Sequence, residues 1–215
     1  PFHHPAHRVM VPRRKWDFRG RNMTDDAHSI IITGAGSGIG RATARRFIRA
    51  GWRVGLIGRG EAALHETADG ADALILPCDV TDAAAVDAAF DTAAARWGRL
   101  GVIFNNAGRG ADPATPDELS PDDFAQVMLV NINGMFHCAR AAFRIMRAQQ
   151  PQGGRIINIG SISAHAPRAG SIALASTQPS AVAGMTSTIS GGSSSATRAQ
   201  IASAMRRLAK YWFSA

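Results

Sequence analysis

The segment TGAGSGIG, residues 33–40, decides the fold of this chain. Residues 29–32 (SIII) in front of it are typical of a buried strand, and residues 41–50 after it are predicted to form a helix. Glycines let backbone N–H groups approach an anion closely, and the helix N-terminus carries a partial positive charge. The order of strand, glycine turn and helix therefore predicts a phosphate site, with a glycine-rich turn that binds nothing as the alternative.

Strand-like and helix-like segments alternate after this turn, as a parallel sheet with crossover helices requires. The further strands are expected at residues 53–58, 73–78, 101–105 and 155–159. Helices are expected at 62–68, at 82–97 after a Thr81 cap, and at 121–148 after a Ser120 cap. These segments predict an α/β protein with a Rossmann-like, doubly wound parallel sheet in three layers.

The composition indicates one soluble domain in a reducing compartment. The chain has 215 residues, 46% of them hydrophobic, and lacks the run of roughly 18 apolar residues that a membrane span needs. Cys78 and Cys138 give neither a disulfide framework nor a metal-binding spacing. We therefore expect a cytoplasmic protein with no membrane segment and no metal site.

The basic residues are concentrated at the two ends of the chain. Residues 1–22 contain six basic residues and one acidic residue, and residues 174–215 contain four basic residues and no acidic one. The net charge of +8 therefore comes from the ends, and the body is close to neutral. A basic arm can bind polyanions without specificity, which makes polyanion binding the third alternative for function; we expect no nucleic-acid partner.

The end of the second predicted strand indicates which nucleotide binds. An acidic residue there would hydrogen-bond to the ribose 2′-hydroxyl of NAD, whereas a basic residue would accommodate the 2′-phosphate of NADP. Arg59 follows this strand, and the first acidic residue is Glu61. The sequence favours NADP over NAD as the cofactor, and the alternative role of Arg59 is that of an exposed residue at the start of a helix.

Five spaced motifs resemble those of the short-chain dehydrogenase/reductase family, in register from Ile30 to about Ala173. They are the glycine turn, Cys78-Asp79-Val80, the sequence NNAG at 105–108, Asn131, and Ser161 after the fifth strand. The resemblance implies hydride transfer between a nicotinamide and a small carbonyl or alcohol substrate. It assigns cofactor contacts to Gly34, Ser37, Gly38, Ile39, Gly40, Arg59, Asp79, Val80, Asn106, Ala107 and Gly108, and catalytic roles to Ser161 and Asn131.

The catalytic pattern of the family is interrupted. The family places a proton-donating tyrosine 13 residues after the serine and a lysine four residues later; here these positions are Leu174 and Gln178. The only tyrosine is Tyr211, and the lysines are Lys15 and Lys210. His165 is a weak substitute as a proton donor. The alternative function is therefore a catalytically inactive nucleotide-binding or scaffold protein.

The expected domain boundaries follow from these breaks. Residues 1–22 are interpreted as a disordered basic extension before Met23, 23–173 as the NAD(P)-binding domain, and 174–215 as an atypical tail. Residues 191–195 have linker composition, and no apolar run in the tail resembles a sixth or seventh strand. We attribute 1–22 and 174–215 to translation outside the proper reading frame, and we expect the C-terminal strands to be incomplete. In the family, the helix that corresponds to the one from Pro121 usually forms the interface between subunits, so the sequence is compatible with a homo-oligomer.

Overall fold

The computed structural model describes residues 28–160, 170, 188 and 189. The predicted N-terminal extension therefore lies outside the described residues, as does all of the predicted tail apart from residues 188 and 189.

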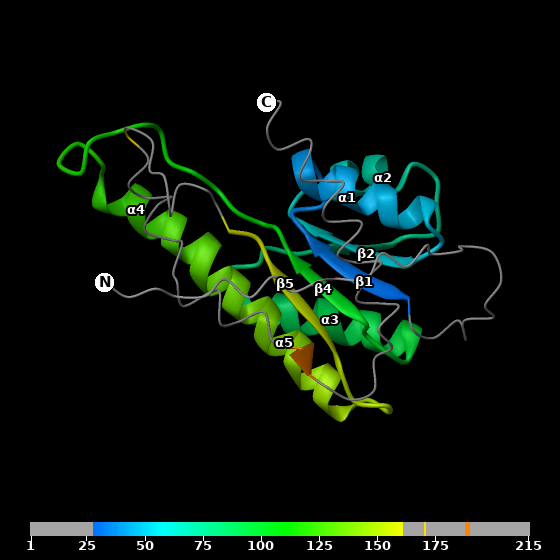
Figure 1. The fold of residues 1–215 in the computed structure, drawn as a ribbon. Coiled ribbons are helices and arrows are strands. Elements are labelled where there is room, and N and C mark those ends of the chain that lie inside the picture. Colours follow the sequence, from blue (N-terminus) through cyan, green and yellow to red (C-terminus); the bar gives the residue numbers. More distant parts are fainter. Residues whose placement is uncertain (1–27, 161–169, 171–187, 190–215) are drawn as a thin grey trace, which may run out of the picture.

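One sheet forms the centre of the molecule, with the strand order β3-β2-β1-β4-β5-β6 (Figure 1). The first five strands pair in parallel, which confirms the predicted doubly wound sheet. Their bounds lie within two residues of those predicted: β1 Ser29–Thr33, β2 Arg53–Gly58, β3 Leu74–Pro77, β4 Val102–Asn105 and β5 Gly154–Asn158. Apolar runs bounded by glycine or proline were a sufficient local signal for these strands.

The predicted tail contributes one short strand to the sheet, although none of its segments has the apolar pattern of a strand. Thr188–Ile189 forms β6, which pairs antiparallel with Gly154 and Arg155 of β5. Two residues are too few to produce an alternating apolar pattern, so the sequence carried no signal for this strand. The strand covers the first part of an edge that would otherwise expose its backbone N–H and C=O groups.

The helices form two layers, one on each face of the sheet, and produce the three-layer architecture (Figure 1). Helices α1 (Gly38–Arg49) and α2 (Glu61–Ala68) cover one face, and α3 (Ala83–Trp97) and α5 (Met135–Ala148) cover the other. The central strand β1 shows why two layers are needed: Ile30 and Ile32 belong to the core on the α1 side, whereas Ile31 belongs to the core on the α3 side. All three side chains are fully buried.

The helix boundaries follow the caps. Ser120 caps α4 (Pro121–Met128) as predicted, because its hydroxyl oxygen accepts a hydrogen bond from the N–H of Asp123 at 3.0 Å. The predicted Thr81 cap for α3 is wrong. The carboxylate of Asp82 caps this helix by accepting from the N–H groups of residues 84 and 85, which a hydroxyl one position earlier does not do.

The helix predicted over 121–148 is continuous in direction but changes its hydrogen-bond pattern. A π-helix, η2 (Leu129–Gly134), separates α4 from α5. Such short π-helical segments are rare and occur frequently at functional sites. The segment contains Asn131, one of the predicted site residues. No helix within the described part of the chain is long and apolar enough to cross a membrane.

Candidate functional site

The predicted cofactor residues come together at the carboxyl edge of the sheet. The glycine turn follows β1, Arg59 follows β2, Asp79 and Val80 follow β3, and Asn106 follows β4. The chain runs from β1 outward to β2 and β3, and then returns to β4 on the other side of β1. Ligands of open α/β sheets bind where the strand order reverses in this way, outside the carboxyl ends of the strands.

The glycine turn packs tightly against the segment that follows β4. A Cβ atom on Gly40 would lie only 2.1 Å from the carbonyl oxygen of Gly34, and Gly34 itself has φ +65°. The side-chain amide of Asn106 donates to the carbonyl oxygen of Thr33 at 3.0 Å. The hydroxyl oxygen of Thr33 accepts hydrogen bonds from the N–H groups of Asn106 (3.0 Å) and Ala107 (2.9 Å).

Thr33 is therefore a site residue that the sequence interpretation did not single out. Its signal was present, because it is the first residue of the glycine motif and ends β1. It is 1% exposed, so its hydroxyl joins the two loops from inside and does not face a ligand. It fixes the position of Asn106 relative to the turn.

The N-terminus of α1 is suited to an anion. Ser37 is its N-cap residue but makes no side-chain capping hydrogen bond, and the first turn contains no acidic residue. Residues 37–39 are exposed, including Ile39 with 39% of its surface accessible. The first N–H groups of a helix lack intrahelical partners, so they are available to a pyrophosphate at this position. This turn and helix N-terminus, residues 34–40, form a cradle that therefore fits the phosphates of a dinucleotide.

Arg41 stabilises this turn from behind. Its guanidinium donates to the carbonyl oxygen of Gly36 and forms an ion pair with Glu66 of α2 at 2.8 Å. The arginine therefore ties the turn to α2, and its charge is already paired within the protein. The phosphate site relies on backbone N–H groups and the helix dipole, as the glycine pattern predicted.

Arg59 and Asp79 lie close enough to interact electrostatically. Arg59 is exposed beyond the end of β2, and Asp79 is partly buried beyond the end of β3. The pKa of Asp79 lies below its ordinary value, first because the N–H of Thr81 donates to the carboxylate, then through the Thr81 hydroxyl and the positive charge of Arg59. The N–H and hydroxyl of Thr81 lie 2.9 and 2.8 Å from Asp79 Oδ1. Asp79 is consequently a fixed, ionised acceptor at neutral pH.

Asn131 fastens the loop after β4 to the π-helix. Its Oδ1 accepts from the N–H of Arg109 at 2.8 Å, and its Nδ2 donates to the carbonyl oxygen of Arg109 at 2.9 Å. A Cβ atom on Gly108 would lie 3.2 Å from Asn131 Oδ1, which shows how closely the loop and the helix approach. The side chain of Asn131 therefore orders the loop that contains Asn106, Ala107 and Gly108.

Ser161 lies outside the described residues, as do His165, Leu174 and Gln178. The structure does describe the strand that leads to Ser161. The side-chain amide of Asn105 donates to Asn158 Oδ1 at 2.8 Å, joining the last residues of β4 and β5. Asn105 is 5% exposed, so this bond links the two strand ends inside the protein.

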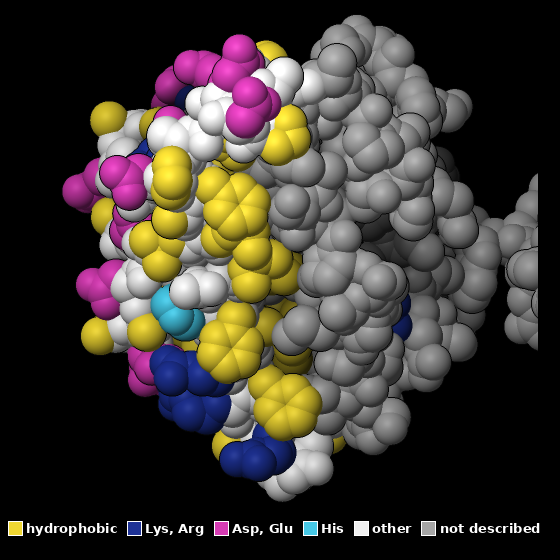
Figure 2. Space-filling view, turned by 90° about the vertical axis from the view of Figure 1, so that its left-hand side faces the viewer, with side chains coloured by type: hydrophobic (Ala, Val, Ile, Leu, Met, Phe, Trp, Pro, Cys, Tyr) yellow, Lys and Arg dark blue, Asp and Glu magenta, His cyan; other side chains and the backbone are white. Residues whose placement is uncertain are grey.

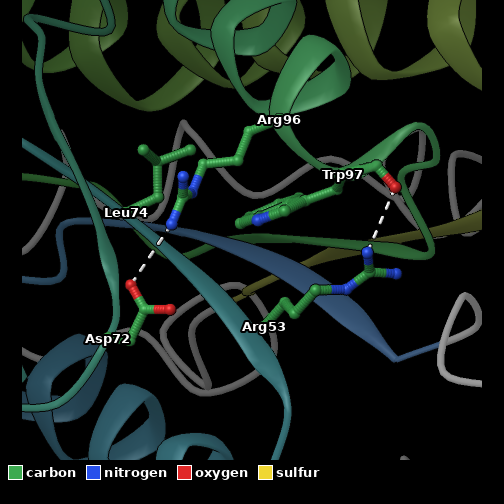
Figure 3. Close-up of a pocket in the computed structure, with 5 residues that line it drawn as sticks. All are labelled: Arg53, Asp72, Leu74, Arg96 and Trp97. Atoms are coloured by element: carbon green, nitrogen blue, oxygen red, sulfur yellow. Dashed lines mark hydrogen bonds and ion pairs between the residues drawn. The ribbon is translucent and has the colours of Figure 1, made fainter.

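A separate cavity of about 150 Å³ opens at the opposite edge of the sheet. It is lined by residues at the starts of β2 and β3 and at the end of α3, namely Arg53, Asp72, Leu74, Arg96 and Trp97 (Figure 3). Arg53 donates to the carbonyl oxygen of Trp97, and Arg96 contacts Asp72 at 3.4 Å. This cavity includes none of the predicted cofactor residues. Among the described residues, no group of three or more potential ligands could hold a metal ion.

The fold and the arrangement at the carboxyl edge define a doubly wound α/β protein with a dinucleotide cradle. The family model for short chain dehydrogenase matches residues 28–196. The chain belongs to the short-chain dehydrogenase family, a family of oxidoreductases, and its sheet has the NAD(P)-binding fold of that family.

Individual relatives match a similar part of the chain. It is 38% identical over 145 residues to a 3beta-hydroxysteroid dehydrogenase of Mediterraneibacter gnavus, a match that covers 64% of this chain and 51% of that protein. It is also 38% identical over 152 residues to (5R,7aS)-5-hydroxy-7a-methyl-1-oxo-2,3,5,6,7,7a-hexahydro-1H-indene-carboxyl-CoA reductase of Mycobacterium tuberculosis, covering 68% of this chain and 57% of that one. The chain thus spans little more than half the length of these relatives.

A solved structure shows the same fold. The 3-ketoacyl-(acyl-carrier-protein) reductase from Brucella melitensis, complexed with NADH, superposes with a TM-score of 0.67 at 30% identity. The match covers 71% of this chain and 64% of that one.

Proposed function

We propose that this chain is the nucleotide-binding part of an NAD(P)-dependent oxidoreductase that transfers hydride between NADP(H) and a carbonyl or alcohol group of a small molecule. The observation that carries the proposal is the open cradle at residues 34–40, which has an exposed helix N-terminus and whose Gly34 and Gly40 pack closely against the segment after β4, where the strand order reverses. When bound, the nicotinamide supplies the hydride chemistry. The residues of the protein bind the dinucleotide and orient it.

The proposed cofactor contacts follow the positions of the side chains at the carboxyl edge. The turn at residues 34–40 would hold the pyrophosphate, Asp79 and Val80 the adenine, and residues 106–108 the nicotinamide half. Arg59 would bind the 2′-phosphate, since its guanidinium is exposed at the end of β2. Glu61, the first carboxylate after β2, faces His65 on the same helix at 3.7 Å. These features support NADP over NAD.

The cofactor preference is tested by exchanging Arg59. We expect Arg59→Ala to weaken NADPH binding by about 10- to 100-fold, the effect of about 1.5–3 kcal/mol for a hydrogen bond to a charged group, and to leave NADH binding nearly unchanged. Fluorescence titration of both nucleotides measures this ratio. Arg49→Ala, an exposed arginine at the far end of α1, is the matched control.

Two results would argue against this assignment. An unchanged NADPH-to-NADH ratio in Arg59→Ala would overturn the assignment of NADP. Failure of the unaltered chain to bind either nucleotide would overturn the proposed function as a whole.

Nucleotide binding without turnover is the second candidate function. The observation that favours it is the presence of Leu174 and Gln178 where the family has its tyrosine and lysine. Positioned acid–base groups typically contribute about 10²- to 10⁴-fold to rate, and Ser161 with Asn131 does not replace a proton donor. Nucleotide binding together with no NADPH oxidation over a panel of ketones and aldehydes would establish this second function; oxidation that depends on Ser161 would establish the first.

We also propose that the protein acts in the cytoplasm as a homo-oligomer. Both cysteines in the described part of the chain are free thiols, which supports a reducing compartment. Phe136 and Phe143 of α5 are 53% and 42% exposed, and Figure 2 shows hydrophobic side chains gathered on this side of the molecule. Exposed aromatic side chains on one helix support contact with a second copy. Analytical ultracentrifugation of the purified chain tests this assembly.

A further inference from the structure

The helical segment from Asn131 to His137 contacts both loops of the candidate site. At its start, Asn131 binds the backbone of Arg109 in the loop after β4. At its end, Gly134 and His137 contact Val80 in the loop after β3. The resemblance to the family pointed to Asn131 and Val80 but to neither Gly134 nor His137.

The contact between Gly134 and Val80 leaves no room for a side chain. A Cβ atom at position 134 would lie 2.6 Å from Cγ2, 3.2 Å from Cβ and 3.4 Å from the carbonyl oxygen of Val80. A Cβ atom essentially never approaches another heavy atom within 3.0 Å. Glycine at position 134 therefore allows the helix to lie directly on Val80, which is 7% exposed.

His137 adds a hydrogen bond to the same residue. Its Nδ1 lies 3.1 Å from the carbonyl oxygen of Val80, 57 positions away in the sequence. A carbonyl oxygen can only accept, so Nδ1 carries the proton and donates it to this bond. The backbone of Val80 is thus held by a side chain at a point where strand β3 has already ended.

The loop after β3 is fixed from two sides. From within, Asp79 accepts hydrogen bonds from the N–H and hydroxyl of Thr81. From outside, Gly134 and His137 hold Val80 against the helix. Because Asp79 and Val80 are adjacent, fixing the backbone of one restricts the direction of the other. A loop ordered before binding loses less conformational entropy when its ligand arrives.

We propose that Gly134 and His137 are positioning residues for the cofactor, which hold the loop at residues 79–81 in the conformation that receives the adenine half of the dinucleotide. This inference rests on the proposed function, since it takes a dinucleotide to bind beside Asp79. It assigns to two residues of the helix a role in nucleotide affinity that the family motifs do not give them.

Two substitutions of His137 separate this role from helix stability. In His137→Asn the amide nitrogen occupies the place of Nδ1 and keeps a donor, whereas His137→Leu removes it. Leucine is the better helix former, so a purely structural role favours Leu over Asn. A positioning role predicts the opposite order for nucleotide affinity, with His137→Asn binding more tightly than His137→Leu. His65→Leu, an exposed helical histidine on α2, is the matched control.

The measurement is the dissociation constant of NADPH and of its adenine half, 2′,5′-ADP, by calorimetry on the full chain. We expect His137→Leu to weaken both by about 3- to 10-fold, the effect of one lost hydrogen bond, and His137→Asn to bind within about twofold of the unaltered chain. Gly134→Ala, which forces Val80 to move, should weaken both more than His137→Leu does. The His65→Leu control should bind as the unaltered chain does.

Each outcome decides one of the two proposals. If the unaltered chain binds NADPH and His137→Leu binds it equally well, the positioning role is overturned while the proposed function stands. The same holds if the Asn and Leu variants are equally weak, or if His137→Leu weakens NADPH but not 2′,5′-ADP. If the unaltered chain binds neither nucleotide, the proposed function is overturned, and the positioning role that rests on it is overturned as well.

Discussion

Replacing Gly40 by alanine tests whether the glycine turn is built for close packing of backbone on backbone. Gly40 lies in the first turn of α1 and is buried. Its added Cβ would be 2.1 Å from the carbonyl oxygen of Gly34 and 2.7 Å from the side-chain amide nitrogen (Nδ2) of Asn106. The atom it meets first belongs to the backbone, which cannot rotate away as the end of a long side chain could. The turn and α1 would have to separate.

The expected magnitude combines two opposing effects. Overpacking typically costs about 1–3 kcal/mol, and the backbone contact places Gly40→Ala near the upper end, at about 3 kcal/mol. Alanine in place of glycine inside a helix returns about 1 kcal/mol. The net loss in the free energy of unfolding is therefore about 2 kcal/mol, which lowers the urea midpoint by roughly 1 M at a slope of about 2 kcal/mol/M.

Urea unfolding of the unaltered chain and two variants measures this loss. The control is Gly60→Ala, because a Cβ at Gly60 would approach no atom closer than 3.8 Å and its backbone has φ −95°. We expect Gly60→Ala to lower the free energy of unfolding by less than about 1 kcal/mol, the preference for glycine over alanine at an N-cap. If Gly40→Ala were as stable as the unaltered chain, or more stable through its helix propensity, the packing argument would be refuted.

Two further predictions concern titratable groups near the loop after β3. Because the folded-state pKa of Asp79 lies below its ordinary 3.8, ionised Asp79 stabilises the fold above that pH, and this contribution is lost as the pH falls through the folded value. Asp79→Asn should therefore lower the free energy of unfolding at pH 7 by up to about 1 kcal/mol, and urea unfolding at decreasing pH should show the gap closing; a gap that widens in acid would contradict this. Burial chiefly raises the pKa of Cys78 to about 11 and of Cys138 to about 12, so fewer than about one thiol in a thousand is ionised at pH 7.5. Ellman's reagent should react with both only after unfolding, and rapid reaction of the native protein would show that a thiol is accessible.

The sequence was sufficient for the parts of the fold that depend on local patterns. Ile30–Ile32 is apolar throughout because β1 is central and buried on both faces, and this pattern is visible without any knowledge of its neighbours. The glycine turn was equally clear, since residue type alone marks the positions of close approach. Placing the segments after β1 to β4 at one edge then required only that the strands be parallel.

Features that depend on partners distant in sequence could not be predicted. Asn131 was selected from a family motif, but its partner Arg109 lies 22 residues earlier and no pattern relates the two. His137 follows the helical period of its neighbours, and its bond to Val80 spans 57 residues. The π-helix shifts the hydrogen bonds of η2 without interrupting the run of helix-forming residues, so a single long helix was the natural prediction.

The positions of the functional residues separate binding from chemistry in this chain. Every residue proposed to touch the dinucleotide lies between 34 and 108, and contacts that order these loops come from residues 33, 41, 81, 131, 134 and 137. The family places its proton-transfer residues at 161, 174 and 178, after β5 has ended. Leu174 and Gln178 stand at the positions where the family has its proton donor and its lysine. The second candidate function therefore predicts loss of turnover, and turnover and cofactor affinity have to be measured separately.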